Sequence, residues 1–177
     1  MTIFYAVLVL VAAQRGGELL LARANTVRLL RDGAIEADPT GYKWLVLLHT
    51  AWLVALAVTV PAATPPHWPL LALFVLLQAG RVWVISSLGR RWTTRLIVVP
   101  GAPLVVSGPY HWINHPNYLI VAGEIAILPL AFDALAIAAG FSACNALLLM
   151  RRIRLEQAAL GLPSHHIRET LPRRNLL

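Results

Sequence analysis

Long apolar runs separated by short polar segments dominate the chain. The runs cover residues 3–13, 44–60, 68–88 and 117–150. A transmembrane helix needs about 20 predominantly apolar residues. The first three runs therefore predict three membrane-spanning helices. We expect the first of them to continue as one long helix past Arg15 and Glu18, whose spacing lets them pair on one face.

The fourth run is too long for a single span. At ~1.5 Å per residue it would cover about 50 Å, whereas the hydrocarbon core is about 30 Å thick. Pro129 and Asp133 lie near its middle, so we expect a tight hairpin of two spans. The pattern predicts an all-α integral membrane protein with five transmembrane helices, a C-terminal helical hairpin and a single domain over residues 1–177.

The basic residues support this topology. Charged residues make up 13% of the chain and the formal net charge is +7, whereas an ordinary soluble domain carries about 25% charged residues. With five spans, every basic segment between or after the spans falls on one side of the membrane. These segments carry Arg23, Arg28, Arg31, Lys43, Arg90, Arg91, Arg95, Arg151, Arg152, Arg154, Arg168, Arg173 and Arg174. The positive-inside rule then predicts an external N-terminus and a cytoplasmic C-terminus. The membrane topology accounts for the positive net charge of the chain. We therefore expect no nucleic-acid partner.

Several other features narrow the chemistry. Cys144 is the only cysteine, so neither an internal disulfide nor a cysteine metal cluster is possible. His111 and His115, like the adjacent His165 and His166, lack a carboxylate at a recognised metal-binding spacing, and we predict no metal site. Four tryptophans fall near predicted span ends, where indole rings favour the membrane interface: Trp44, Trp68, Trp92 and Trp112.

The densest polar grouping, residues 107–118, stands just before the fourth span. Pro116 suits the first position of a helix, where its missing N–H costs nothing. The free N–H groups of that helix start favour an anion such as a carboxylate or phosphate. The alternative is an interfacial turn with aromatic anchors. Upstream, residues 96–99 and 104–106 are short β-prone stretches that we expect to be extended.

Two further groupings are candidates. Arg154 and Glu156 follow the last span. Either they serve a site, or the basic residues there mark the cytoplasmic end and Glu156 pairs with one of them. Arg81 and Glu124 lie at membrane depth, where ionisable groups usually face a partner or a cavity. They form either a structural pair or one that lines a pocket. His49, within the second span, is a weaker candidate.

A family resemblance connects these groupings. The segment Gly108-Pro-Tyr-His-Trp-Ile-Asn-His-Pro-Asn-Tyr118, followed by Glu124, a helical hairpin and Arg154-Leu-Glu156, resembles the isoprenylcysteine carboxyl methyltransferase family. Residues 81–83, 88–94 and 100–104 look closer to its bacterial branch, which includes alkylpyrone O-methyltransferases. Gln14-Arg15 with Glu18, and Leu48-His49 with Trp52, also fit that branch.

The resemblance implies S-adenosylmethionine as cofactor, in a cytosol-facing pocket of a protein of the bacterial inner membrane. The cofactor-binding residues would be Tyr110, His111, His115, Pro116, Asn117, Tyr118, Arg154 and Glu156. A lipophilic acceptor with an acidic oxygen, either a long-chain pyrone or resorcinol or a prenylated carboxylate, would contact His49, Arg81, Trp83 and Glu124. We expect Arg81 and Glu124 to be catalytic, Arg81 holding the acceptor's oxyanion and Glu124 orienting Arg81.

The chain departs from the family pattern at three positions. His111 and Asn114 stand where the family usually has arginine, and Gln157 stands where a second acid is common. Three alternatives stay open at this point: a phospholipid N-methyltransferase, a sterol-type reductase of related fold, and a non-catalytic membrane protein that binds a lipid or quinone. Sequence leaves the oligomeric state open.

Overall fold

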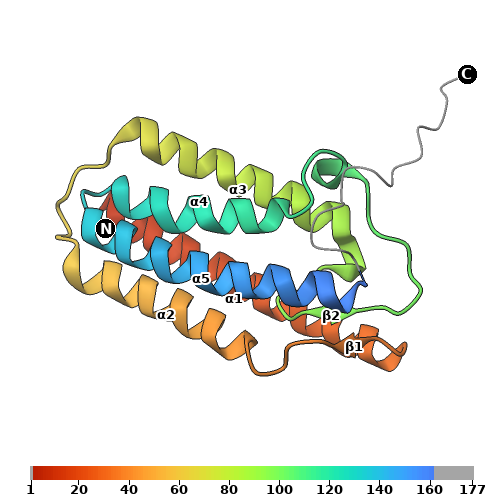
Figure 1. Ribbon diagram of the computed structural model, residues 1–177. Coiled ribbons are helices and arrows are strands. Elements are labelled where there is room, and N and C mark those ends of the chain that lie inside the picture. Colours follow the sequence, from red (N-terminus) through yellow and green to blue (C-terminus); the bar gives the residue numbers. More distant parts are fainter. Residues whose placement is uncertain (1, 162–177) are drawn as a thin grey trace, which may run out of the picture.

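The computed structural model describes residues 2–161, which form a bundle of five helices (Figure 1). The helices are α1 (Ile3–Arg31), α2 (Tyr42–Thr59), α3 (Trp68–Leu88), α4 (Pro116–Leu130) and α5 (Leu135–Ala159). The predicted all-α membrane fold is confirmed. The tail that carries Arg168, Arg173, Arg174, the pair His165 and His166 and the C-terminus lies outside the described residues.

The helices differ in length, and α4 is shorter than a full span. Within residues 2–161, four helices (α1, α2, α3 and α5) are long and apolar enough to cross a membrane. Helix α4 has 15 residues, which at ~1.5 Å each covers about 22 Å, less than the ~30 Å hydrocarbon core. Pro116 starts it, at a position where the missing N–H costs nothing. Pro129 lies one residue before its end and cannot donate the helical hydrogen bond there.

The predicted hairpin joins α4 to α5 at one end of the bundle. Asp133 adopts a positive φ of 59° there, and the Ala134 N–H donates to the Pro129 carbonyl oxygen at 2.9 Å. The segment before α3 is tied to this turn, because His67 Nε2 lies 2.7 Å from Asp133 Oδ1. The two connections without Lys or Arg therefore meet at the same end of the molecule.

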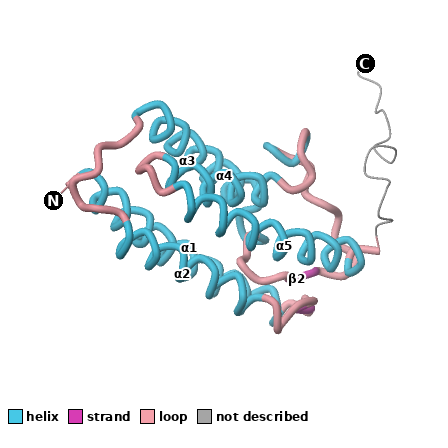
Figure 2. The backbone as a smooth tube through the Cα atoms, turned by 60° about the vertical axis from the view of Figure 1, so that its left-hand side comes forward, coloured by secondary structure: helices cyan, strands magenta, loops and turns pink. Residues whose placement is uncertain are grey.

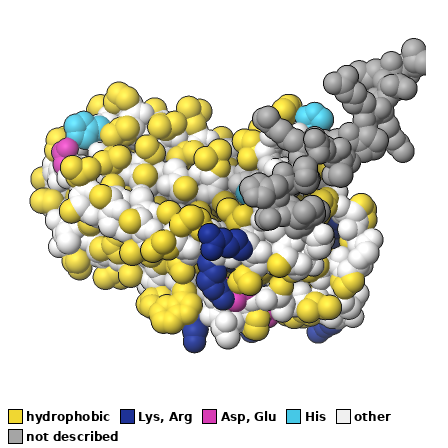
Figure 3. All heavy atoms as spheres, in the orientation of Figure 1, with side chains coloured by type: hydrophobic (Ala, Val, Ile, Leu, Met, Phe, Trp, Pro, Cys, Tyr) yellow, Lys and Arg dark blue, Asp and Glu magenta, His cyan; other side chains and the backbone are white. Residues whose placement is uncertain are grey.

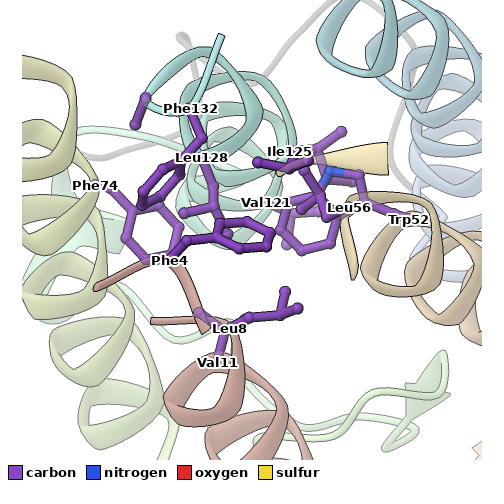
Figure 4. Close-up of a cluster of buried hydrophobic side chains, with 12 residues drawn as sticks. Phe4, Leu8, Val11, Trp52, Leu56, Phe74, Val121, Ile125, Leu128 and Phe132 are labelled. Atoms are coloured by element: carbon purple, nitrogen blue, oxygen red, sulfur yellow. The ribbon is translucent and has the colours of Figure 1, made fainter. Parts of the chain in front are cut away.

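The core lies in the half of the bundle near this hairpin. Phe4, Leu8 and Val11 of α1 point toward side chains of the other helices (Figure 4). The cluster comprises Phe4, Leu8, Val11, Trp52, Leu56, Val60, Phe74, Val121, Ile125, Leu128, Ala131 and Phe132. Hydrophobic side chains are spread over the face seen in Figure 3, with few charged side chains among them, as expected for a protein whose surroundings are lipid tails rather than water.

The opposite end of the bundle carries the long polar segments. Two short strands, β1 (Ile35–Glu36) and β2 (Ile97–Val98), pair antiparallel there, beside the helix ends (Figure 2). An ion pair between Arg95 and Glu36 at 3.0 Å reinforces them. The extended stretch expected around residues 96–99 is thus a strand, whereas residues 104–106 have no assigned secondary structure. We call this end of the bundle, which carries the two strands, the basic last turn of α1 and the Arg-rich segment after α3, the basic end.

Candidate functional site

A cavity of about 400 Å³ opens at the basic end. Its walls come from the segment 91–106, from the turn 110–118 and from the end of α5. Sites for small molecules commonly have volumes of about 300–1,000 Å³. We call this space the larger cavity.

Tyr118 and Glu156 close one wall of the larger cavity. The Tyr118 hydroxyl donates to Glu156 Oε2 at 2.6 Å and accepts from Arg152 Nε at 3.1 Å. His115 stacks on the Tyr118 ring with 5.2 Å between the centroids, and its Nδ1 lies 3.5 Å from Glu156 Oε2. The first turn of α4 and the last turns of α5 are therefore joined through polar groups.

Two polar atoms in this wall lack a hydrogen-bond partner among residues 2–161. His115 Nε2 and Asn117 Oδ1 are buried and form no hydrogen bond within the described residues. Buried polar groups in native proteins are nearly always satisfied, so these two atoms beside the cavity are available to a polar ligand or to water. Burial, reinforced by the negative charge of Glu156, raises the pKa of Tyr110. The phenol of Tyr110 therefore stays protonated at neutral pH and is available as a donor.

The turn that leads into α4 depends on Gly108. Its φ is +60°, and a Cβ at this position would overlap the side chain of Ser87. Glycine alone meets both requirements. Trp83 of α3 packs against Trp112, with ring centroids 5.9 Å apart, and so fixes the outer edge of the same turn.

A second cavity, of about 170 Å³, lies between the helices. All five helices contribute to its lining, which includes His49, Thr50 and Leu53 of α2. His49 Nδ1 lies 2.8 Å from the Leu45 carbonyl oxygen. Because a carbonyl only accepts, Nδ1 carries the hydrogen, and a neutral His49 keeps Nε2 as an acceptor. We call this space the inner cavity.

A network of ion pairs borders the inner cavity. Glu124, 1% exposed, accepts hydrogen bonds from the Nε and Nη2 atoms of Arg81, from Arg15 at 2.6 Å and from Gln78 at 2.8 Å. Glu18 accepts from Arg15 at 2.7 Å and from Arg81 at 3.3 Å. Two arginines thus face two carboxylates, and the cluster carries no net charge.

The two cavities share a wall. Five residues line both of them: Trp92, Thr93, Asn117, Tyr118 and Arg152. A ligand in the larger cavity and a ligand in the inner cavity would therefore meet across these side chains.

The predicted site residues fall into three groups: those that line the larger cavity, those that line the inner cavity and those that line neither. The residues that line the larger cavity are Tyr110, His111, His115, Asn117, Tyr118 and Glu156, and those that line the inner cavity are His49 and Arg81, with Asn117 and Tyr118 again. Four predicted residues line neither cavity. Pro116 is buried at the start of α4, Glu124 lies behind Arg81, Arg154 is exposed, and Trp83 packs against the turn.

Sequence reasoning missed several residues of the ion-pair network and of the shared wall. Arg15 and Glu18 were expected to pair with each other, but their part in the Arg81–Glu124 network depends on how α1 packs against α3 and α4. Gln78 looked like a mere interruption of an apolar run. Trp92, expected at the membrane interface, is 2% exposed and lies in the shared wall, because the segment after α3 folds back across the helix ends. Arg152 was counted only as a topology marker.

Comparison with known proteins agrees with this geometry. Residues 70–161 match the isoprenylcysteine carboxyl methyltransferase (ICMT) family, a stretch that contains the turn, α4 and α5. The chain is also 37% identical over 161 residues, 89% of its length, to Uncharacterized protein YpbQ of Bacillus subtilis (strain 168), of which the match covers 96%. No solved structure matches. The chain belongs to the isoprenylcysteine carboxyl methyltransferase family, a family of membrane methyltransferases.

Proposed function

We propose that the protein transfers a methyl group from S-adenosylmethionine to an acidic oxygen of a lipophilic acceptor. The observation that carries this proposal is the pair of adjoining cavities, one at the basic end and lined in part by polar side chains, the other between the helices and largely apolar, with five lining residues in common. Such an arrangement suits a water-soluble donor and a lipid-like acceptor that meet at the shared wall.

The residues of the larger cavity fit the methyl donor, S-adenosylmethionine. Glu156 is suited to accept hydrogen bonds from ribose hydroxyls or from an ammonium group. The unpaired His115 Nε2 and Asn117 Oδ1 atoms offer two further polar contacts. When bound there, S-adenosylmethionine would supply an electrophilic methyl group on a positively charged sulfur.

The start of α4 supplies fewer free backbone N–H groups than expected. Pro116 has no N–H, and the Tyr118 and Leu119 N–H groups already donate to the His115 carbonyl oxygen. The Asn117 N–H has no acceptor within residues 2–161. We therefore infer that the carboxylate of S-adenosylmethionine would accept a hydrogen bond from one backbone N–H here rather than from several.

The inner cavity fits the reactive ring or headgroup of an acceptor rather than its tail. A cavity of about 150 Å³ holds a benzene ring, so the observed 170 Å³ is of ring size. A long chain would extend between the helices into lipid. This favours a long-chain pyrone or resorcinol over a prenylated carboxylate. In this proposal His49 contacts the acceptor, and Arg81, held by Glu124, contributes to the wall around it.

The protein's main tasks would be alignment and exclusion of water. An ionised acceptor oxygen needs no strong base, and holding two reactants in line lowers the barrier by itself. Family membership favours this methyltransferase role over a reductase or a non-catalytic carrier. We also propose that the basic end faces the cytoplasm of a bacterial inner membrane, because the positive-inside rule places Lys- and Arg-rich segments there.

The test is binding followed by transfer. Calorimetric titration of the purified protein in detergent with S-adenosylhomocysteine should give micromolar affinity. Glu156→Gln should weaken it at least tenfold, whereas Glu36→Gln, at the strand pair and outside both cavities, should not change it. Isotope-labelled S-adenosylmethionine should then label an added alkylpyrone or alkylresorcinol. Absence of both binding and transfer in the wild type would refute the proposal.

A further inference from the structure

Two arginines in the described chain are buried, and their surroundings differ. Arg81 is 3% exposed and Arg152 is 9% exposed. All three guanidinium nitrogens of Arg81 donate to the carboxylates of Glu18 and Glu124. Arg152 forms no ion pair with any residue in the range 2–161: its Nε donates to the Tyr118 hydroxyl at 3.1 Å and its Nη2 to the Thr94 carbonyl oxygen at 2.8 Å.

Arg152 is a buried charge that no carboxylate contacts directly, since Glu156 reaches it only through the Tyr118 hydroxyl. Because a buried charge is costly, proteins pair such groups or use them to bind something. The neighbouring Arg151 shows the ordinary outcome, since it forms two hydrogen bonds with Asp38, at 2.7 and 3.1 Å. Arg152 instead has two neutral partners that fix the guanidinium plane, while its third nitrogen, Nη1, donates to no atom of the described chain.

The place of Arg152 indicates what its missing partner is. Arg152 belongs to the wall shared by the two cavities. Three arginines line the inner cavity, namely Arg15, Arg81 and Arg152. The first two are neutralised by Glu18 and Glu124. Within the described residues, Arg152 is thus the one arginine of the inner cavity that no carboxylate contacts directly, and it reaches Glu156 only through the Tyr118 hydroxyl.

We propose that Arg152 binds the anionic oxygen that receives the methyl group, at the boundary between the two cavities. This inference rests on the proposed function and deepens it, because it names the residue that selects the acceptor. A guanidinium in a site of low dielectric favours an acceptor that is ionised, such as an acidic enol, phenol or carboxylic acid, over a neutral alcohol.

The same contact would also help the product to leave. Methylation converts an anionic oxygen into a neutral ether or ester. The product then no longer provides a counter-charge for Arg152. The site should therefore bind the acid more tightly than the corresponding methyl compound, and this difference is measurable without any methyl donor.

The experiment measures binding of two matched probes in the absence of methyl donor. The probes are a 4-hydroxy-2-pyrone with an undecyl chain and its 4-O-methyl ether, titrated into the protein in detergent. In the wild type we expect the acid to bind at least tenfold more tightly than the ether, since a hydrogen bond to a charged group commonly accounts for such a factor. Arg152→Gln should reduce the ratio to within twofold and leave ether binding unchanged.

Two further variants make the test specific. Arg152→Lys keeps the charge and should retain most of the preference, which also covers the case in which the glutamine variant does not fold. Arg90→Gln removes an equal charge from an exposed position at the basic end and should behave as the wild type does.

Three results would overturn the assignment: equal binding of acid and ether by the wild type, an unchanged ratio in Arg152→Gln, or loss of the preference in Arg152→Lys. A wild type that prefers the acid but does not bind S-adenosylhomocysteine would contradict the proposed function and leave the role of Arg152 intact. A wild type that binds S-adenosylhomocysteine but shows no acid preference would contradict the role of Arg152 and leave the proposed function intact.

Discussion

The Tyr118 hydroxyl donates to Glu156 at 2.6 Å and at the same time accepts a hydrogen bond from Arg152 at 3.1 Å. One phenol oxygen thus joins a carboxylate and a guanidinium that lie one turn apart on α5. Because Tyr118 stands at the start of α4, it also ties the two helices of the hairpin together at the end remote from the hairpin turn. Both proposed ligands would lie next to this oxygen.

Replacing Tyr118 with phenylalanine tests that link. The ring, and with it the stacking against His115, would remain, but Glu156 and Arg152 would each lose a partner. A hydrogen bond to a charged group contributes about 1.5–3 kcal/mol, so we expect the Kd for S-adenosylhomocysteine to rise about tenfold in calorimetric titration. Tyr5→Phe, at the other end of the bundle, is the matched control. Unchanged affinity in Tyr118→Phe would mean that the phenol does not position Glu156.

Glu124 should matter more for stability than for ligand contact. Glu124→Gln would leave Arg15 and Arg81 facing the single carboxylate of Glu18. Breaking a buried ion pair costs about 3–5 kcal/mol, so the variant should unfold at a clearly lower temperature in detergent. Glu36→Gln, whose partner Arg95 has a side chain 40% exposed, should cost less than about 1 kcal/mol. Equal melting temperatures for the two variants would contradict a structural role for the network.

The pair Asp38–Arg151 should make stability depend on pH. Hydrogen bonds from Arg151, assisted by the Gly41 N–H, hold the pKa of Asp38 below its usual value, although burial opposes this shift. A carboxylate with a depressed pKa stabilises the folded state above about pH 4, the usual pKa of aspartate, and this contribution is lost as the pH falls through the folded-state pKa.

Thermal melts of Asp38→Asn and wild type should therefore differ at pH 7 and pH 5 and converge below pH 4. The exposed Asp32, just after α1, provides the control: Asp32→Asn should give a curve parallel to that of the wild type. A difference between Asp38→Asn and wild type that does not shrink between pH 5 and pH 2 would contradict this account.

The proposed orientation can be tested with single cysteines. Cys144 is exposed, so the background variant is Cys144→Ser. Ala62→Cys lies in the connection between α2 and α3, and Arg90→Cys lies at the basic end. In bacterial spheroplasts an impermeant maleimide should label the first at once and the second only after permeabilisation. The opposite pattern would reverse the topology.

Most of the fold follows from hydropathy. Apolar runs of span length, interrupted by prolines and separated by basic segments, predicted all five helices and the turn near Asp133. The shortness of α4 was not predicted, because hydropathy alone cannot separate a helix from the apolar turn that follows it. The pairing of Ile35–Glu36 with residues 97–98 was also missed, since it joins segments far apart in sequence.

The site was only partly predictable. The turn of residues 108–118 and Glu156 were found through local spacing and family resemblance. The shared wall was not, because Trp92 and Arg152 belong to it only through long-range packing: Arg152 donates to the Thr94 carbonyl oxygen, a contact that no local pattern encodes. In the same way, the neutralisation of Arg81 by Glu18 depends on how α1 and α3 pack.

The central claim is that a methyl donor binds at the basic end, next to the shared wall. A structure of the protein determined with S-adenosylhomocysteine tests it most directly. We predict density for the ligand in the larger cavity, between the turn of residues 110–118 and Glu156, with polar contacts to His115 or Asn117. Density in another place, or a larger cavity that stays closed at saturating ligand, would contradict it.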